Sequence, residues 1–212
     1  MRRAIIFLNG DLSNFKNAKQ HIKPTDLIIC TDGAAEKALI LNLVPNVIIG
    51  DLDSLSNKVQ QNLKKYPIKW VRFQREKDES DSELATDYCL KQNYKEIVIF
   101  GLLGSRLDHL LSNIFHLEDL VKKEMNVKIV EGNQEIYPIN TKIKIIGRIG
   151  NLISLIPLSG MVKGVSTEGL KYKLDNENLL FGYSRGISNI MTQKEIEISL
   201  QEGTLLIVHT KN

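Results

Sequence analysis

Short apolar runs alternate with amphipathic segments from Ala4 to about Val130. The apolar runs are continuous, as expected for strands of a sheet that is covered on both faces. They are the stretches AIIFL, DLIIC, NVIIG, IKWVRF, EIVIF and VKIV. Between them, apolar residues recur at helical spacing in AAEKALILN, NKVQQNLKKY, SELATDYCLKQN and RLDHLLSNIFHLEDLVKKEM. This alternation predicts an α/β domain built on a doubly wound, mainly parallel sheet.

The helical pattern ends at about Tyr137, and short strand-like runs follow one another between glycine, asparagine and lysine turns. Ile196, Ile198 and Leu200 alternate with polar neighbours, which is typical of a strand with one buried face. This half is typical of a small barrel or, as we expect here, an antiparallel β-sandwich. We place the boundary near NQEIYPINTK, which gives domains of residues 1–136 and 137–212.

Composition and charge narrow the class of protein. The apolar fraction of 42% and the charged fraction of 25% are those of an ordinary globular protein. The net charge of +3 is spread along the chain, so we expect no nucleic-acid partner. Two cysteines suit reduced thiols in a cytoplasmic protein better than a disulfide framework. The first apolar run has about five residues, fewer than the roughly 7 to 15 of a signal peptide, and we expect no membrane partner.

Acidic residues follow four of the predicted strands. They are Asp32, Asp51, Asp53, Asp78, Asp81 and Asp108. Ligands of a doubly wound sheet bind outside the carboxyl ends of its strands, so these side chains should meet at one edge. Negative charges at such short distances oppose folding unless a cation binds between them. Magnesium fits, because it binds carboxylates together with the phosphates of a substrate. The alternative is that the aspartates are solvated loop residues or helix caps.

Asp81 illustrates both interpretations. Ser80 and Glu83 have the spacing of a capping box, which would place Asp81 in the first turn of a helix. A carboxylate is favoured there by the helix dipole alone. The same position would also hold it rigidly at the edge of the sheet, within reach of a metal or a hydroxyl.

The stretch GLLGSRLDHLLSN leads from a strand through a turn of small residues into a long helix. Gly101, Gly104 and Ser105 allow the backbone to approach a phosphate, and Arg106 supplies a planar cation beside the helix amino terminus. The stretch is neither a Walker sequence nor GxGxxG. His109 is either a packing residue or a functional one.

Together these stretches resemble bacterial thiamine pyrophosphokinases along nearly the full chain. The matching stretches are TDGAAEKAL, PNVIIGDLDSL, EKDESDSELA, GLLGSRLDHLLSN, STEGLKYKL and GISN. The resemblance implies an α/β domain followed by a β-rich domain. It also implies an enzyme of the EC 2.7.6.2 type, which transfers the pyrophosphoryl group of ATP to the hydroxyl of thiamine and gives thiamine diphosphate and AMP.

The resemblance also implies roles for individual residues. It assigns catalysis to Asp51, Asp53, Asp78 and Asp81, and Mg²⁺ to Asp51, Asp53 and Asp81. It assigns the nucleotide to Asp32, Gly101, Gly104, Ser105, Arg106, Asp108 and His109. It assigns thiamine to Lys77, Asp81, Tyr172, Ser188 and Asn189, in a site shared across a homodimer. Tyr172 stands where relatives often have tryptophan, and Asp81 could accept the proton of the thiamine hydroxyl instead of binding the metal.

Two rival functions share part of this pattern. A haloacid-dehalogenase-like phosphatase needs D-x-D-x-T after its first strand, whereas here Leu55 stands in place of the threonine and the motif follows the third strand. The other rival is a non-catalytic nucleotide sensor. AMP release that depends on thiamine would separate all three.

Overall fold

The computed structural model describes residues 2–10, 18–74, 79–104 and 106–212. The chain forms two compact units. The first comprises Met1–His116 and Met125–Gly132, and the second comprises Leu117–Glu124 and Asn133–Asn212.

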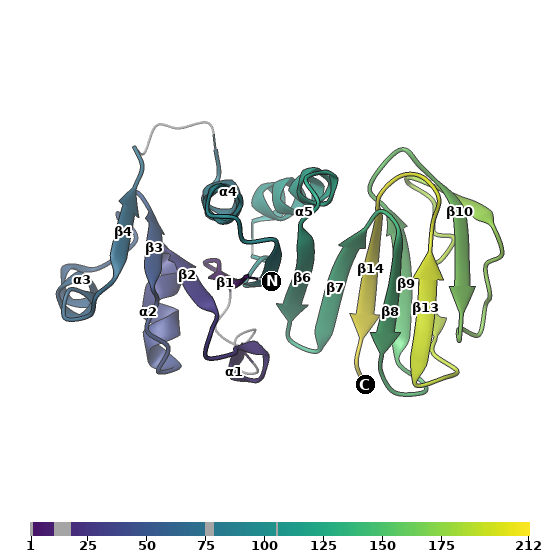
Figure 1. The fold of residues 1–212 in the computed structure, drawn as a ribbon, viewed down its shortest axis with the longest axis horizontal. Helices are drawn as coiled ribbons and strands as arrows, with labels where there is room; N and C mark the ends of the chain where they lie inside the picture. The colour runs from purple at the N-terminus through teal and green to yellow at the C-terminus, as the bar shows by residue number, and fades with distance from the viewer. Residues whose placement is uncertain (1, 11–17, 75–78, 105) are drawn as a thin grey trace. The chain divides into compact units, whose positions relative to one another are not determined.

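The first unit is built on a parallel sheet with the strand order β6-β5-β1-β2-β3-β4 (Figure 1). The strands are β1 Arg3–Phe7, β2 Leu27–Thr31, β3 Val47–Gly50, β4 Lys69–Arg72, β5 Glu96–Phe100 and β6 Asn126–Glu131. Each neighbouring pair in this order is parallel. The order reverses between β1 and β5, so the topological switch point lies there. The predicted doubly wound sheet is confirmed.

Helices cover both faces of this sheet, with α4 on one side and α2 on the other in Figure 1. The helices are α1 Ala18–His21, α2 Asp32–Ile40, α3 Asn57–Leu63, α4 Asp81–Lys91 and α5 Leu107–Lys122. Phe7 and Phe100, on the adjacent strands β1 and β5, are fully buried, and their stacked rings lie 5.2 Å apart. The two strands that meet at the switch point are therefore joined by a stacked aromatic pair.

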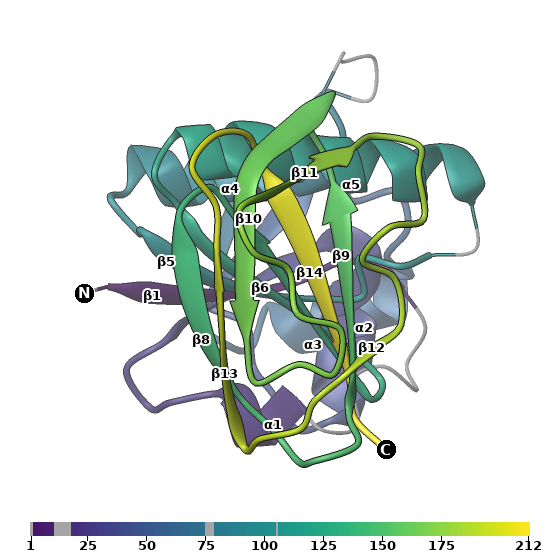
Figure 2. The same cartoon turned by 90° about the vertical axis from the view of Figure 1, so that its right-hand side faces the viewer.

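The second unit consists of antiparallel strands in the orders β12-β9-β14-β7 and β11-β10-β13-β8. Figure 2 looks onto this unit and shows β10 in front of β14. The strands are β7 Gln134–Ile139, β8 Lys142–Ile146, β9 Leu152–Pro157, β10 Met161–Glu168, β11 Glu177–Leu180, β12 Asn189–Ile190, β13 Glu195–Ser199 and β14 Leu205–Thr210. Ile196 and Ile198 are buried in its core as their alternation predicts. The predicted antiparallel sandwich is confirmed.

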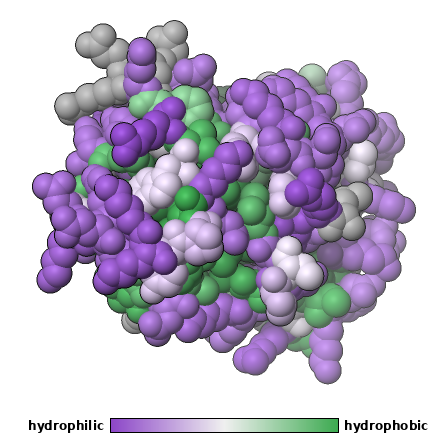
Figure 3. All heavy atoms as spheres, turned by 60° about the vertical axis from the view of Figure 1, so that its left-hand side comes forward, coloured by the Kyte–Doolittle hydropathy of each residue, from purple (hydrophilic) through white to green (hydrophobic). Residues whose placement is uncertain are grey.

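Both cysteines are free and fully buried, so they pack inside the first unit, as expected for small core residues. Among the described residues, no helix is long and apolar enough to cross a membrane. On the face shown in Figure 3, hydrophobic surface is visible between hydrophilic groups. In the first unit the exposed apolar side chains include Ile40, with 61% of its surface accessible, and Phe115, with 51%.

Candidate active site

A hollow of about 560 Å³ lies at the topological switch point of the first unit. We call it the switch-point hollow. It is lined by Leu8, Asn9, Gly10, Thr31, Ser54, Glu79, Ser80, Asp81, Ser82, Gly101, Leu102, Gly104, Arg106, His109 and Asn113. These residues come from the loops after β1, β3 and β5, from the end of β2 and from the starts of α4 and α5. This is where a doubly wound sheet is expected to bind a ligand.

The loops after β1 and β5 touch at two glycines. A Cβ atom on Gly10 would lie only 2.6 Å from the Cα atom of Gly101, so no other residue fits at this position without moving the backbone. The amide of Leu8 donates to the carbonyl of Phe100 at 2.8 Å and extends the strand pairing into these loops. Backbone thus forms the floor of the hollow, which lets a ligand approach it closely.

A cluster of three carboxylates lies at the carboxyl ends of β2 and β3. Oxygen atoms of Asp32, Asp51 and Asp53 lie within 4.8 Å of one another. Asp32 is the first residue of α2 and only 4% exposed, and its Oδ1 accepts the amide of Gly33 at 2.7 Å. A Cβ atom on Gly50 would lie 3.2 Å from the Asp32 side chain, so glycine at the end of β3 makes room for this carboxylate. The predicted convergence of strand-end aspartates is confirmed for these three residues.

The loop that carries Asp51 and Asp53 is a tight turn. The amide of Asp53 donates to Oδ1 of Asp51 at 3.1 Å, and Leu52 between them has a φ of 68°. Leucine in the left-handed region is strained, but its side chain is buried with 5% exposure, and this burial holds the turn. The buried Leu52 side chain therefore fixes the positions of Asp51 and Asp53 on either side of it.

The electrostatics of the cluster favour a bound cation. Burial raises the pKa of Asp32 above its ordinary value, and the charges of Asp81 and Asp51 raise it further. Hydrogen bonds from the amides of Gly33 and Ser54 act in the opposite direction. A divalent ion with hard oxygen ligands would stabilise the charged form of all these carboxylates, so the donor set fits Mg²⁺.

Asp81 begins α4 and lines the switch-point hollow. The predicted capping box is confirmed, because Ser80 Oγ accepts the amide of Glu83 at 3.2 Å and a Glu83 carboxylate oxygen accepts the amide of Ser80 at 2.7 Å. The helix start is therefore fixed, and with it the position of Asp81. Two further candidates from the sequence, Lys77 and Asp78, precede this helix and lie outside the described residues.

Arg106 and His109 line the same hollow at the start of α5, and Ser105 beside them lies outside the described residues. Arg106 forms a fork with Asp108, with Nε to Oδ1 at 3.2 Å and Nη2 to Oδ2 at 2.5 Å. Hydrogen bonding from Arg106 lowers the pKa of Asp108 to about 2. Both side chains are exposed, so solvent weakens the pair and the guanidinium is able to exchange Asp108 for a phosphate. Asp108 therefore lies beside the hollow as the partner of Arg106.

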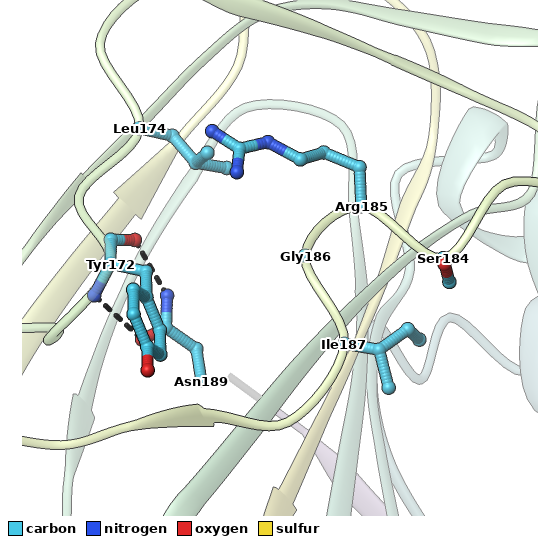
Figure 4. Close-up of a pocket in the computed structure, with 7 residues that line it drawn as sticks. All are labelled: Tyr172, Leu174, Ser184, Arg185, Gly186, Ile187 and Asn189. Carbon is cyan, nitrogen blue, oxygen red and sulfur yellow. Dashed lines mark hydrogen bonds between the residues drawn. The ribbon is translucent and has the colours of Figure 1, made fainter.

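The second unit has a hollow of its own, of about 420 Å³, which we call the Tyr172 hollow. It is lined by Tyr172, Leu174, Ser184, Arg185, Gly186, Ile187 and Asn189 (Figure 4). Asn189 is buried and holds the Tyr172 backbone from both sides, accepting its amide at 3.0 Å and donating to its carbonyl at 2.7 Å. Ser188 does not line the hollow, and its amide donates to Ser154 Oγ at 3.0 Å.

Some lining residues lie outside the set expected from the sequence. In the first unit these include Asn9, Gly10, Ser54 and Asn113. In the second unit Arg185, which forms a fork with Glu177 at 2.9 Å, was not singled out. Asn9 and Gly10 do follow the first strand, so the rule that ligands bind at strand ends could have found them. Ser54 lies in the loop after the third strand and could have been found in the same way, whereas Asn113 and Arg185 are brought in by contacts distant in sequence.

Comparison with known proteins decides the family. Residues 18–129 match the profile of the thiamin pyrophosphokinase catalytic domain, and residues 140–205 match that of the thiamin pyrophosphokinase vitamin B1 binding domain. The chain belongs to the thiamine pyrophosphokinase family. A phosphatase of the haloacid dehalogenase type is thereby set aside.

Individual members of the family align with most of the chain. The thiamine pyrophosphokinase of Bacillus subtilis is 28% identical over 186 residues, which cover 87% of each chain. Thiamin pyrophosphokinase 1 of Caenorhabditis elegans is 23% identical over 98% of this chain and 89% of its own. A crystal structure of the Bacillus subtilis protein superimposes with a TM-score of 0.91 at 25% identity and covers 100% of both chains.

Proposed function

We propose that this chain is a thiamine pyrophosphokinase, which transfers the pyrophosphoryl group of ATP to the hydroxyl of thiamine. The family supplies the reaction. The observation that carries the proposal is the cluster of Asp32, Asp51 and Asp53 beside a hollow that also holds Asp81 and Arg106. The reaction requires carboxylates for a metal, a cation for phosphates and an oxygen base, and these residues supply all three.

In this proposal Asp32, Asp51 and Asp53 hold Mg²⁺, which, when bound, neutralises charge on the triphosphate. The earlier expectation placed Asp81 among the metal ligands. We propose Asp32 as the third ligand in place of Asp81, because Asp32 is buried and its carboxylate lies beside those of Asp51 and Asp53. Asp81 is then available for the thiamine hydroxyl, and Asp78 remains a catalytic candidate from the sequence motif alone.

The transfer itself is a displacement at the β-phosphorus of ATP. The thiamine hydroxyl oxygen forms a bond to this phosphorus while the bond from phosphorus to the bridging oxygen of AMP breaks. The hydroxyl proton passes to a carboxylate oxygen of Asp81, and AMP leaves with the bridging oxygen. Arg106 binds phosphate oxygens through its planar fork, and the backbone at Gly101 and Gly104 allows the phosphates to approach. Positioning and charge neutralisation supply most of the rate in such reactions.

We assign thiamine recognition to the second unit, with Lys77 and Asp81 contributing from the first. Tyr172 is 57% exposed, and its aromatic ring suits the positively charged thiazolium ring of thiamine. Asn189 fixes the Tyr172 backbone, so we expect it to act on thiamine chiefly through Tyr172. Ser188 is the residue before Asn189 and stays a candidate for contact with thiamine. In this scheme residues 1–136 are the catalytic domain and residues 137–212 bind thiamine.

We also propose that the enzyme is a cytoplasmic homodimer in which the Tyr172 hollow of one subunit completes the active site of its partner. Exposed apolar residues support an interface, including Phe181 and Tyr183, which are 51% and 69% exposed and precede the lining residue Ser184 in the chain. Two free buried thiols agree with a reducing compartment.

Activity is tested by chromatography of nucleotides after incubation with MgATP, with and without thiamine. We expect AMP and thiamine diphosphate in equal amounts, and neither without thiamine. Release of ADP or phosphate without thiamine would refute the assignment. A nucleotide sensor would bind ATP and release no AMP under any of these conditions.

The shared site is tested by mixing Asp53→Asn, which lacks a metal ligand, with Tyr172→Ala, which has a weakened thiamine site, under conditions that allow subunits to exchange. Activity is measured at a thiamine concentration well below the wild-type KM, where weaker thiamine binding lowers the rate. A mixed dimer has one intact composite site, so random exchange should restore about one quarter of the wild-type activity. Each variant mixed with itself serves as the control. Absence of any recovery despite proven exchange would show that each subunit works alone.

A further inference from the structure

The loop after β1 brings one polar side chain, Asn9, to the switch-point hollow. The amide of Gly10 donates to the carbonyl of Leu8 at 2.9 Å, so Asn9 stands at the tip of a tight three-residue turn. Gly10 is buried against Gly101, whereas Asn9 is exposed. The turn therefore presents the Asn9 side chain at the wall of the hollow.

Lys37 on α2 holds this turn in place through hydrogen bonds. Its ammonium donates to the carbonyl of Asn9 at 3.2 Å, to the side-chain oxygen of Asn9 at 2.7 Å and to the carbonyl of Gly10. All three of these acceptors belong to the loop after β1. Lys37 is thus occupied with the protein backbone and with Asn9, which makes it a positioning residue for the loop.

The contact with Lys37 also decides which way the Asn9 amide faces. An ammonium only donates, so the atom at 2.7 Å is the amide oxygen, and the amino group occupies the other position. That amino group packs over Gly33 at the start of α2, where a Cβ atom would lie 2.4 Å from it. Within the part of the chain that the structure describes, the Asn9 amino group donates no hydrogen bond.

From this arrangement we infer that Asn9 binds substrate, donating from its amino group to a phosphate oxygen of the nucleotide, and that Lys37 positions it. The inference rests on the proposed function. The carboxylate cluster would draw the metal-bound triphosphate to the carboxyl ends of β2 and β3. This position is next to the start of α2, against which the side-chain amide of Asn9 packs. An amide donor carries no charge, so it binds phosphate without competing with the metal for the carboxylates.

The test measures binding of Mg·α,β-methylene-ATP, which has no cleavable bond at the site of transfer, by calorimetry. Asn9→Asp keeps an acceptor for Lys37 and removes the donor, and Asn9→Ala removes the donor without adding charge. We expect both variants to bind at least tenfold more weakly, as for loss of a hydrogen bond to a charged group. Asn93→Asp, in the turn after α4 at the opposite end of the sheet, is the matched control and should bind like wild type.

Two further measurements and one comparison between the Asn9 variants separate the possible results. Binding of Mg·tripolyphosphate should weaken by a similar factor, and a loss seen only with the nucleotide would place Asn9 at the base or ribose and overturn the phosphate assignment. A loss in Asn9→Asp but not in Asn9→Ala would mean repulsion by the new charge and would also overturn it. Lys37→Met should raise the KM for ATP and leave the KM for thiamine unchanged, with partial recovery in Lys37→Arg.

The outcome for the proposed function is read separately from wild type. If wild type binds Mg·α,β-methylene-ATP and forms AMP with thiamine while the Asn9 variants match it, only the role of Asn9 is wrong. If wild type itself neither binds the analogue nor forms AMP, the proposed function fails, and this inference fails with it.

Discussion

Replacing Asp32 with asparagine should stabilise the protein in the absence of metal and abolish its response to magnesium. The asparagine oxygen can still accept the amide of Gly33, as Asp32 Oδ1 does at 2.7 Å. The substitution keeps the shape of the side chain and removes one charge from a cluster of like charges. The stabilisation therefore reports the relief of this repulsion together with the relief of burying the Asp32 charge.

The size of the effect follows from the distance between the carboxylates. Two unit charges 4.8 Å apart repel by about 0.9 kcal/mol in bulk water and about 3.5 kcal/mol at an effective dielectric constant of about 20. Asp51 is half-buried and Asp53 exposed, so solvent screens much of this repulsion. We expect the free energy of unfolding to rise by about 1 to 2 kcal/mol in total, or the melting temperature by about 2 to 8 °C.

The assay is thermal unfolding in EDTA and in a series of magnesium concentrations. Wild type should gain about 2.7 kcal/mol at a magnesium concentration 100 times its Kd, whereas Asp32→Asn should gain far less. Asp87→Asn on α4 removes an equal charge outside the cluster and controls for net charge. A variant that is less stable than wild type in EDTA, or that keeps the full response to magnesium, would refute the reasoning.

Three other substitutions test separate parts of the structure. Arg106→Lys should raise the KM for ATP or lower kcat without changing the melting temperature, because a point charge cannot reproduce a planar fork on phosphate; wild-type kinetics would exclude Arg106 from the site. Tyr172→Ala should weaken thiamine binding by about 0.5 to 2 kcal/mol with ATP binding unchanged, whereas equal loss of both ligands would indicate unfolding. Asp26→Asn should cost about 3 to 5 kcal/mol of unfolding free energy at pH 7, since Asp26 forms a buried ion pair with Arg3 at 2.6 Å. Burial raises the pKa of Asp26, but hydrogen bonds from Arg3 and from the amide of Lys23 outweigh this and leave it lowered. The difference between this variant and wild type should therefore shrink as the pH falls below about 3.9 and through the lowered pKa, and a constant difference would contradict it.

The sequence predicted the strands and the carboxylate edge well because both depend on local patterns. A continuous apolar run such as VIIG can only be buried on both faces, and its last residue fixes where Asp51 and Asp53 emerge. The capping box at Ser80 is equally local, since two residues three positions apart, Ser80 and Glu83, form it. Such features need no knowledge of which strands are neighbours.

Other parts of the site depend on contacts distant in sequence. The nearness of Asp32 to Asp51 requires Gly50, whose missing side chain leaves room for the carboxylate. Asn9 enters the site because β1 pairs with β5, which brings Gly10 against Gly101. The position of Asn9 just after the first strand makes it a candidate from the sequence, but its contact with the loop after β5 is set by the strand order.

The central claim is tested most directly by following the phosphates of ATP through the reaction. With ATP labelled at the γ-phosphate, Mg²⁺ and thiamine, the account predicts that the label appears in thiamine diphosphate, while label at the α-phosphate appears only in AMP. The two products should form in equal amounts. Label from the γ-phosphate in thiamine monophosphate or in free phosphate, with ADP as the nucleotide product, would contradict transfer of an intact pyrophosphoryl group.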